Sequence, residues 1–248
     1  MERQIISSQF SFTSRIAVIV VAANNIIRTT DTRTTGKIVF QRFATGHSWK
    51  DWATMTKISS LCAFCGSKTG DDPAHTEAAR RLGAIMAERG VRLIYGGGRI
   101  GLMGVVAEAV HQGGGEVIGV IPEFLMHLEV GNTKIGELIV TENMHTRKQR
   151  MFGLSDGFVA LPGGLGTIDE TIEVVTWKQL RQHAKPVVVM NVGGYWAGLT
   201  ALVDQIIAGG FAHEAIRELF TVVDGPDAVF EALESAPEPN DEVLTSHL

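Results

Sequence analysis

Short apolar runs of strand length alternate with helical segments from Lys57 onward, and this alternation constrains the fold more than any other feature. The runs occupy residues 58–64, 91–95, 117–121, 138–140, 158–161, 187–190 and 220–223. Strands separated by helices pair in parallel through right-handed crossovers, and continuous apolar character indicates that helices cover both faces. The sequence therefore predicts an α/β fold, a single doubly wound, Rossmann-like parallel sheet with helices on both faces.

The segments between the runs have the 3.6-residue period of helices. The first, residues 73–89, places Ala78, Leu82, Ile85 and Met86 on one face, and Gly90 follows its end. Five further helices are predicted at residues 102–111, 144–154, 168–183, 196–207 and 227–233.

Charge and composition divide the chain into three parts. Residues 1–54 carry seven Lys and Arg against three acids, so the net charge of −5 divides into +4 there and −9 in the rest. We expect residues 1–54 to be an extension of doubtful structure, such as an upstream or vector-derived segment before Met55 or a targeting segment. Residues 55–234 form the predicted Rossmann-like domain, and residues 235–248 a flexible acidic tail.

Several classes of function fit this composition poorly. No apolar run approaches the roughly 18 residues that span a bilayer, so we expect no membrane insertion. An acidic body disfavours nucleic-acid binding, which needs a basic face. The single C-x-x-C, Cys62 and Cys65, lacks the further ligands of a zinc site and lies on a strand rather than at the start of a helix. We expect no metal, and a reduced cytoplasmic protein.

Glycine is over-represented, with 28 residues or about 11% of the chain against an average of about 7%. Nine of these glycines fall in the three turns that follow the first, second and fifth predicted strands. Glycine lets the backbone approach a ligand closely, and free amides at a helix N-terminus attract anions. A phosphate loop is therefore predicted, with the candidate residues Gly66, Ser67, Gly97, Gly98, Met103 and Gly104.

The second glycine turn also fits a dinucleotide site or a purely structural turn. Gly96, Gly98 and Gly101 match the dinucleotide pattern G-x-G-x-x-G, with Glu123 about twenty residues further on. The turn follows the second strand rather than the first, which makes an NAD site a weak match. These glycines could also serve only a tight strand-to-helix turn.

The fifth strand runs into Pro-Gly-Gly-Leu-Gly-Thr, after which Thr167 to Glu170 open a helix. Thr-x-x-Glu is a capping box, so Glu170 could simply bond the Thr167 amide. Asp169 and Glu173 lie in the same turn or the next, and three acids exceed what a cap needs. A functional role for Glu170, with Glu173 as an accessory acid, is the alternative.

The fourth strand is followed by Asn143 and then by Met-His-Thr-Arg-Lys. Asn143 suits an N-cap and places Arg147 and Lys148 in the first turns of a helix. Cations there oppose the helix dipole, so binding an anion at the same sheet edge explains them better. A solvated basic face that includes Arg150 is the competing interpretation, and His145 is expected to pack or hydrogen-bond rather than catalyse.

The order and spacing of GGGRIGLMG, MHTRK and PGGLGTIDE resemble the Lonely guy (LOG) family of cytokinin riboside 5′-monophosphate phosphoribohydrolases, over about residues 56–233. Members are often labelled lysine decarboxylases, yet no lysine here stands in a convincing pyridoxal-phosphate setting. The resemblance implies hydrolysis of the N-glycosidic bond of a nucleoside 5′-monophosphate to a free adenine-type base and ribose 5-phosphate. It also implies no metal or organic cofactor, and a homodimer with its site near the subunit interface.

The resemblance also implies roles for individual residues. Arg147 and Glu170 correspond to the catalytic pair. The corresponding substrate contacts are Glu129, Lys148, Gly164, Leu165, Gly166, Thr167, Ile168, Asp169 and Thr176. The segment around His127 and Lys134 is less motif-like, so the base preference among prenylated adenine, adenine and other purines stays open, as does a hormone or salvage role.

A non-catalytic carrier of nucleotides or of the molybdenum cofactor is the alternative function, since similar folds with glycine-rich loops serve that purpose. Glu170 and Glu173 beside Arg147 favour the enzyme, because a phosphate binder gains nothing from carboxylates close to its anion.

Overall fold

The computed structural model describes residues 21–22, 26–29, 39–42, 58–126 and 135–237. The chain divides into two compact units, Met1–Gly46 and His47–Leu248. In the first, the short strands β1 (Val21–Ala22), β2 (Ile26–Thr29) and β3 (Val39–Arg42) form an antiparallel sheet in that order.

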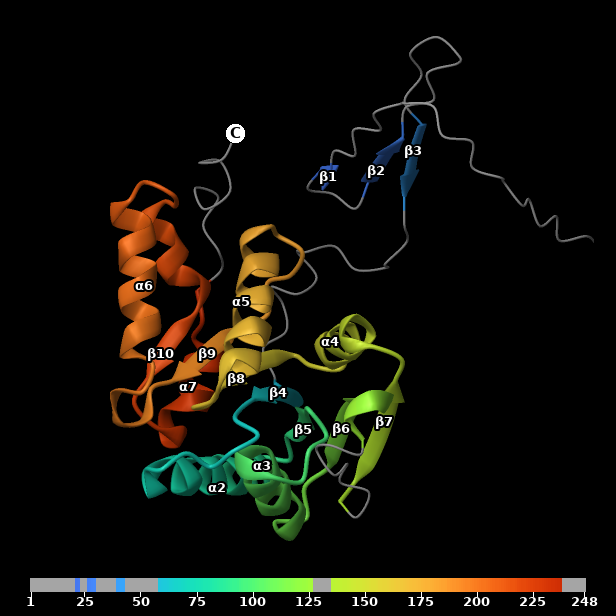
Figure 1. The fold of residues 1–248 in the computed structure, drawn as a ribbon, viewed down its shortest axis with the longest axis vertical. Coiled ribbons are helices and arrows are strands. Elements are labelled where there is room, and N and C mark those ends of the chain that lie inside the picture. The colour runs from blue at the N-terminus through green and yellow to red at the C-terminus, as the bar shows by residue number, and fades with distance from the viewer. Residues whose placement is uncertain (1–20, 23–25, 30–38, 43–57, 127–134, 238–248) are drawn as a thin grey trace, which may run out of the picture. The chain divides into compact units, whose positions relative to one another are not determined.

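The second unit is a sheet of seven parallel strands in the order β10-β9-β8-β4-β5-β6-β7, which confirms the predicted fold class (Figure 1). The strands are β4 (Ser60–Phe64), β5 (Arg92–Tyr95), β6 (Val117–Pro122), β7 (Glu137–Thr141), β8 (Gly157–Ala160), β9 (Val187–Met190) and β10 (Thr221–Val223). Each predicted apolar run contains or overlaps one of them. The inner strands β4, β6, β8 and β9 are buried throughout, whereas the edge strands β7 and β10 are partly exposed.

Helices connect these strands on both faces of the sheet (Figure 1). They are α2 (Pro73–Glu88), α3 (Gly101–Gln112), α4 (Met144–Gly153), α5 (Leu165–Gln179), α6 (Ala197–Ala208) and α7 (Val229–Glu234). Four 3-10 turns join them, η1 (Glu123–Leu125), η2 (Val192–Gly194), η3 (Glu214–Leu219) and η4 (Pro226–Ala228). Among the helices in the described residues, none has the length and apolar character needed to cross a bilayer.

The helices pack on the sheet through two main core clusters. One joins a strand face to α2, α3 and α7, and the other joins the opposite face to α4 and α5. Gly83 of α2 lets α3 approach closely, because a Cβ there would lie 2.7 Å from the Cβ of Ala109 and from the carbonyl oxygen of Val106. The core therefore forms two layers, one on each side of the sheet.

Cys62 and Cys65 lie in different core clusters, on opposite faces of the sheet. Side chains alternate between faces along a strand, so a spacing of three separates them. Both thiols are free and buried, and burial raises the pKa of each above its ordinary value. A neutral, enclosed thiol is a packing group rather than a nucleophile or metal ligand.

Helix α5 starts and ends earlier than the predicted residues 168–183. Its last turn closes when Arg181 takes a left-handed backbone conformation, with φ of 54°, and the Gln182 amide donates to the Trp177 carbonyl. Glycine usually occupies such a position, so no local signal marks this end.

The turn after α5 buries His183 as a neutral imidazole. Its Nε2 lies 2.8 Å from the Val174 carbonyl oxygen, and its Nδ1 accepts a hydrogen bond from the Lys185 amide at 3.1 Å. Burial lowers the pKa of His183 from 6.5 to about 3.

Acid should therefore destabilise the fold through His183. Between pH 6.5 and 3 the unfolded chain binds a proton there that the folded chain does not, so stability falls as the pH falls. The loss should reach about 2 kcal/mol at pH 5. Urea unfolding of the wild type and H183Q at pH 7 and pH 5 measures it, with H145Q at an exposed histidine as the control. An equal acid sensitivity of wild type and H183Q would contradict this expectation.

Candidate active site

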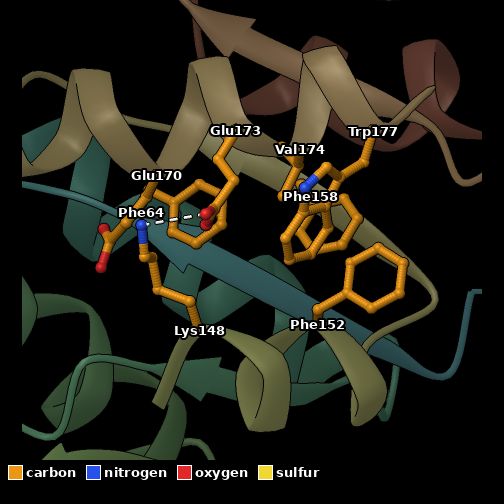
Figure 2. Close-up of a pocket in the computed structure, with 8 residues that line it drawn as sticks. All are labelled: Phe64, Lys148, Phe152, Phe158, Glu170, Glu173, Val174 and Trp177. Atoms are coloured by element: carbon orange, nitrogen blue, oxygen red, sulfur yellow. Dashed lines mark hydrogen bonds and ion pairs between the residues drawn. The ribbon is translucent and has the colours of Figure 1, made fainter. Parts of the chain in front are cut away.

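Helices α4 and α5 face each other beside the sheet, and both contribute charged side chains to the space between them (Figure 2). Helix α4 begins as predicted. The Asn143 side chain accepts hydrogen bonds from the amides of His145 and Thr146, both at 3.0 Å, and Thr146 Oγ1 accepts one from the Asn143 amide. This capping box fixes the first turns of α4, which carry Arg147 and Lys148.

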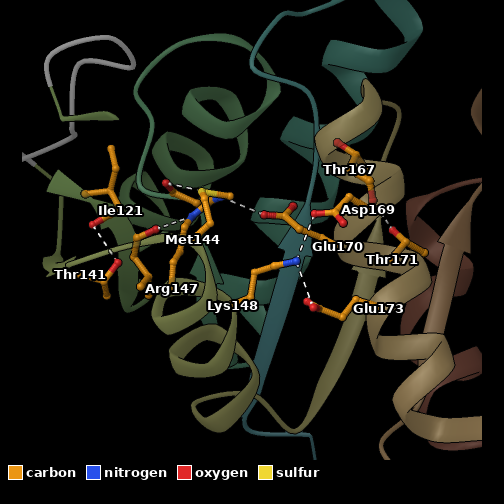
Figure 3. A network of polar contacts seen from close by, with 12 residues as sticks. Ile121, Thr141, Met144, Arg147, Lys148, Thr167, Asp169, Glu170, Thr171 and Glu173 are labelled. Atoms are coloured by element: carbon orange, nitrogen blue, oxygen red, sulfur yellow. Dashed lines mark hydrogen bonds and ion pairs between the residues drawn. The ribbon is translucent and has the colours of Figure 1, made fainter. Parts of the chain in front are cut away.

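The Arg147 guanidinium is buried and held on several sides (Figure 3). Its Nε donates to the Val120 carbonyl at 3.0 Å, and its Nη2 to the Gly96 carbonyl at 3.5 Å. Its Nη1 lies 3.1 Å from Glu170 Oε1, and the two side chains are only 8% and 10% exposed. The structure thus brings Arg147 and Glu170 together as a buried ion pair at the carboxyl edge of the sheet.

Gly96 leaves the room that Arg147 occupies. A Cβ on Gly96 would overlap Nη2 of Arg147 and lie 3.0 Å from the Met103 sulfur. This turn therefore packs against a cation of its own chain, which accounts for Gly96 without a dinucleotide.

G96A should displace the Arg147 guanidinium. If the site is catalytic, its turnover should fall by about 10- to 100-fold, because a misplacement of about 1 Å can have that effect. Steady-state turnover measures it. G153A is the control, because a Cβ at Gly153 would meet no atom within 4 Å. Full activity of G96A would show that turnover does not depend on the position of the Arg147 guanidinium.

Lys148 lies against two carboxylates of α5. Its Nζ is 3.0 Å from Glu173 Oε1 and 3.2 Å from Asp169 Oδ2 (Figure 3). Burial lowers its pKa, but the hydrogen bonds to Glu173 and Asp169 outweigh burial and the pKa is raised overall. With only 13% of the side chain exposed, Lys148 does not belong to a solvated basic face, so that interpretation is wrong for this residue.

Helix α5 begins at Leu165 with Gly164 as the N-cap, so the alternative in which Thr167 and Glu170 form a capping box is wrong. Thr167 lies inside the first turn, where a Cβ on Gly163 would overlap its Oγ1. The side chain of Thr167 lies against Gly163 of the preceding loop and does not cap the helix. The first amides of α5 therefore have no intrahelical acceptor and no side-chain cap.

The three glycine turns converge as predicted, because β8, β4 and β5 are neighbours in the sheet. The Gly66 amide donates to the Pro162 carbonyl at 3.0 Å, and the Met103 amide to the Gly66 carbonyl at 3.4 Å. The strand order reverses between β8 and β4, where ligands of such sheets usually bind. Gly104, however, is explained by packing, since a Cβ there would overlap the Arg99 carbonyl oxygen.

The remaining predicted site residues lie in different surroundings. Gly97 packs against Ile121 of β6 and Leu138 of β7, and Ile168 packs near Trp196. Leu165 is 84% exposed beside the open end of α5, together with Gly164 and Gly166. The three remaining phosphate-loop candidates differ in exposure, with Gly98 and Met103 buried and Ser67 exposed.

The structure does not bring Thr176 to the Arg147–Glu170 pair. Six residues at about 100° each place it about 240° around α5 from Glu170, and it is exposed. Glu129, His127 and Lys134 lie outside the described residues.

A narrow pocket between α4 and α5 was not predicted. Lys148, Glu170 and Glu173 line one end, and the rest of its lining is Phe64, Phe152, Phe158, Val174 and Trp177 (Figure 2). Phe152 contacts Trp177 edge-on at 5.1 Å and stacks on Phe158 at 5.6 Å between ring centroids. Aromatic residues at such spacings are typical of a core, so no sequence signal distinguishes this apolar wall behind the charged groups.

A fourth glycine turn at the same edge also went unpredicted. Gly193 and Gly194 follow β9, and the next residue, Tyr195, reaches the loop after β8. A glycine pair directly after a predicted strand is the signal that could have found it.

Together these groups can hold an anion and stabilise a positive charge next to it. The open amides of α5 attract an anion, and a carboxylate buried beside them is suited to a developing cation. Within the described residues, no cluster of three or more His, Cys, Asp and Glu side chains could hold a metal ion.

Comparisons with known proteins bear on the family. A family model described as "Possible lysine decarboxylase" matches residues 103–233. Cytokinin riboside 5′-monophosphate phosphoribohydrolase LOG7 of Arabidopsis thaliana is 42% identical over 195 residues, which are 79% of this chain and 89% of that protein. Probable cytokinin riboside 5′-monophosphate phosphoribohydrolase LOGL9 of Oryza sativa subsp. japonica is 50% identical over 173 residues, 70% of this chain and 75% of that one.

Solved structures are similar at lower identity. The molybdenum cofactor binding protein of Rippkaea orientalis has a TM-score of 0.55 at 21% identity, covering 72% of this chain and 97% of that one. The Moco carrier protein of Chlamydomonas reinhardtii has a TM-score of 0.53 at 21% identity, covering 73% and 98%. These likenesses show the fold, whereas the family model and the sequence relatives show that the chain belongs to the LOG family of cytokinin riboside 5′-monophosphate phosphoribohydrolases.

Proposed function

We propose that this protein hydrolyses the N-glycosidic bond of a nucleoside 5′-monophosphate, such as AMP or a cytokinin riboside monophosphate. Water adds a hydroxyl group to the anomeric carbon and a proton to the base, which gives free base and ribose 5-phosphate. The observation that carries the proposal is the buried pair of Arg147 and Glu170 next to the open N-terminus of α5. The names of the sequence relatives support the same reaction.

The 5′-phosphate is proposed to bind at the amides of Gly164 to Thr167. A helix N-terminus carries about half a positive charge and presents N–H donors. Lys148 pairs with Asp169, which lies in α5 just after this turn. Its ammonium supplies a further cation near the phosphate. Binding energy from the phosphate then positions the ribose for reaction, although the phosphate itself does not react.

Glu170 is proposed to act on the ribose. Cleavage of a ribosyl bond builds positive charge at the anomeric carbon, and a carboxylate one helical turn beyond the phosphate site can stabilise it and orient water. Arg147 positions this carboxylate, since the carbonyls of Val120 and Gly96 hold the guanidinium in place. Glu173 would then act through Lys148 as the accessory acid.

A molybdenum-cofactor or nucleotide carrier would share the fold but would not need Glu170. A buried carboxylate near a phosphate site weakens anion binding by repulsion. Glu170 would therefore weaken anion binding in a carrier, whereas in a hydrolase it would stabilise the ribosyl cation.

Release of free base from a panel of nucleotides tests the proposal. AMP, isopentenyladenosine 5′-monophosphate and GMP should be compared with adenosine, which lacks the phosphate. We expect cleavage of at least one adenine-type monophosphate and at least about 100-fold slower cleavage of adenosine, because remote binding energy is lost. If no monophosphate releases its base, the proposed reaction is wrong.

We further propose a homodimer in the cytoplasm, with residues 55–234 as the catalytic domain. Exposed apolar side chains at the starts of α3 and α5, Ile100 and Leu165, support a second subunit, and two free buried cysteines support a reducing compartment. Light scattering after gel filtration measures the mass of the assembly, and cell fractionation shows its location. A chain that starts at Met55 should keep the activity if residues 55–234 are the catalytic domain.

A further inference from the structure

The turn that follows β9 projects an aromatic side chain toward the loop that follows β8. Gly193 and Gly194 adopt positive φ angles of 60° and 79°, which residues with a Cβ rarely adopt. The amide of Tyr195 donates to the Val192 carbonyl at 3.1 Å, and the next amide donates to Asn191 Oδ1 at 2.7 Å. The backbone on both sides of Tyr195 is therefore fixed.

The ring of Tyr195 is also held by its neighbours. It contacts His75 of α2 edge-on at 5.2 Å between ring centroids and Trp196 at 4.9 Å. His75 and Trp196 are both buried, whereas Tyr195 is 46% exposed. Tyr195 is thus half exposed, and buried aromatic neighbours hold its ring in place at the carboxyl ends of the strands.

The hydroxyl of Tyr195 donates to the Gly163 carbonyl at 2.6 Å. The carbonyl of Gly163 and the amide of Gly164 belong to one planar trans peptide, so they point in opposite directions. Fixing the carbonyl therefore fixes the direction of the Gly164 amide. Gly164 is the N-cap of α5, the residue that opens the proposed phosphate site.

The preceding peptide is fixed in a similar way. The Gly66 amide donates to the Pro162 carbonyl at 3.0 Å. Both carbonyls before Gly164 are thus occupied by donors of the protein. A carbonyl free to turn toward a phosphate would repel it, so these two bonds keep the loop in its anion-binding form.

We propose that Tyr195 is a positioning residue for the phosphate loop, and that its hydroxyl sets nucleotide affinity through the Gly163–Gly164 peptide. This inference rests on the proposed function for the identity of the ligand. The orientation of the loop itself does not depend on which ligand binds.

Y195F tests the inference because it removes only the hydroxyl. T200V is the matched control, since Thr200 bonds the local Trp196 carbonyl at 3.4 Å and lies outside the loop. Hydrogen exchange of a peptide covering residues 161–168 is measured without ligand. Affinities for AMP and for orthophosphate are measured by calorimetry, kcat and KM by base release, and Tm by thermal unfolding.

For Y195F we expect faster exchange in the loop peptide and about 3- to 10-fold weaker binding of AMP and orthophosphate, the range for one lost hydrogen bond. KM should rise by a similar factor, with kcat within about twofold of the wild type. T200V should match the wild type in exchange and affinity. A merely structural role would instead lower Tm and kcat together and leave phosphate affinity unchanged.

Unchanged exchange or unchanged affinity in Y195F would overturn the inference. If the wild type neither binds nor cleaves nucleotides, the proposed function fails, and the exchange result still decides whether Tyr195 orients the loop. If the wild type cleaves AMP and Y195F is indistinguishable from it, the inference alone fails.

Discussion

E170Q is expected to lose turnover of AMP or isopentenyladenosine monophosphate by about 1,000-fold, the range for removing a charged catalytic group. Glutamine keeps the size of the side chain and can still meet Arg147, but it lacks the negative charge that would stabilise the ribosyl cation. Because Glu170 lies one turn beyond the amides that would hold the phosphate, nucleotide affinity should change far less than turnover.

Base release and calorimetry on the same preparation separate these effects. E231Q, at an exposed carboxylate of α7, is the control and should keep full turnover. Retained activity in E170Q would rule out Glu170 as the catalytic carboxylate. Equal losses of affinity and turnover would mean that Glu170 binds the ground state.

K178M is expected to stabilise the protein by about 3 kcal/mol at pH 7, the equivalent of the lowered pKa of this lysine. Lys178 continues the buried face of α5 formed by Thr167, Glu170, Thr171 and Val174, and it is 1% exposed. Burial lowers the pKa of Lys178 from 10.5 to about 8. Methionine fills similar space without the charge.

The stability gain should depend on pH in a defined direction. Below pH 8 Lys178 is charged in both the folded and the unfolded chain. The folded wild type is then destabilised by the full free energy of burying this charge. Between pH 8 and 10.5 the folded chain is neutral first, and the difference between K178M and wild type should shrink. Thermal unfolding should give a rise in Tm of about 6–10 °C at pH 7.

K185M is the matched control for K178M. Burial also lowers the pKa of Lys185 to about 8. Its ammonium, however, donates to the Phe152 carbonyl at 2.7 Å and lies 4.0 Å from the centre of the Phe152 ring. Because methionine loses these contacts, K185M should not gain stability. A K178M protein no more stable than the wild type would show that Lys178 finds a partner in solution.

The sequence was sufficient for the order and type of the strands and α-helices described in residues 58–126 and 135–234, although it did not predict the 3-10 turns between them. Each predicted strand and helix in this range exists, because hydrophobic periodicity is a local property that follows the geometry of the backbone. The cap at Asn143 was predictable for the same reason. Parallel pairing places the glycine turns at one edge of the sheet, whereas their closeness along that edge follows from the strand order β8-β4-β5.

The start of α5 shows where local reasoning fails. Thr167 and Glu170 have the spacing of a capping box, yet the helix begins two residues before Thr167. Whether a threonine caps a helix depends on what its side chain packs against, and here that neighbour is Gly163 of the preceding loop.

The sequence by itself thus determined the parallel sheet, its two layers of helices and the sheet edge at which we propose that the ligand binds. Only the tertiary structure decided that Arg147 is buried against Val120, Gly96 and Glu170, that Lys148 is paired with two acids, and that Tyr195 bonds the Gly163 carbonyl. The physical reason is that element formation depends on neighbours three or four residues apart, whereas burial and ion pairing depend on groups that different strands bring together. Tyr195 and Gly163 are 32 residues apart, and no local pattern records their contact.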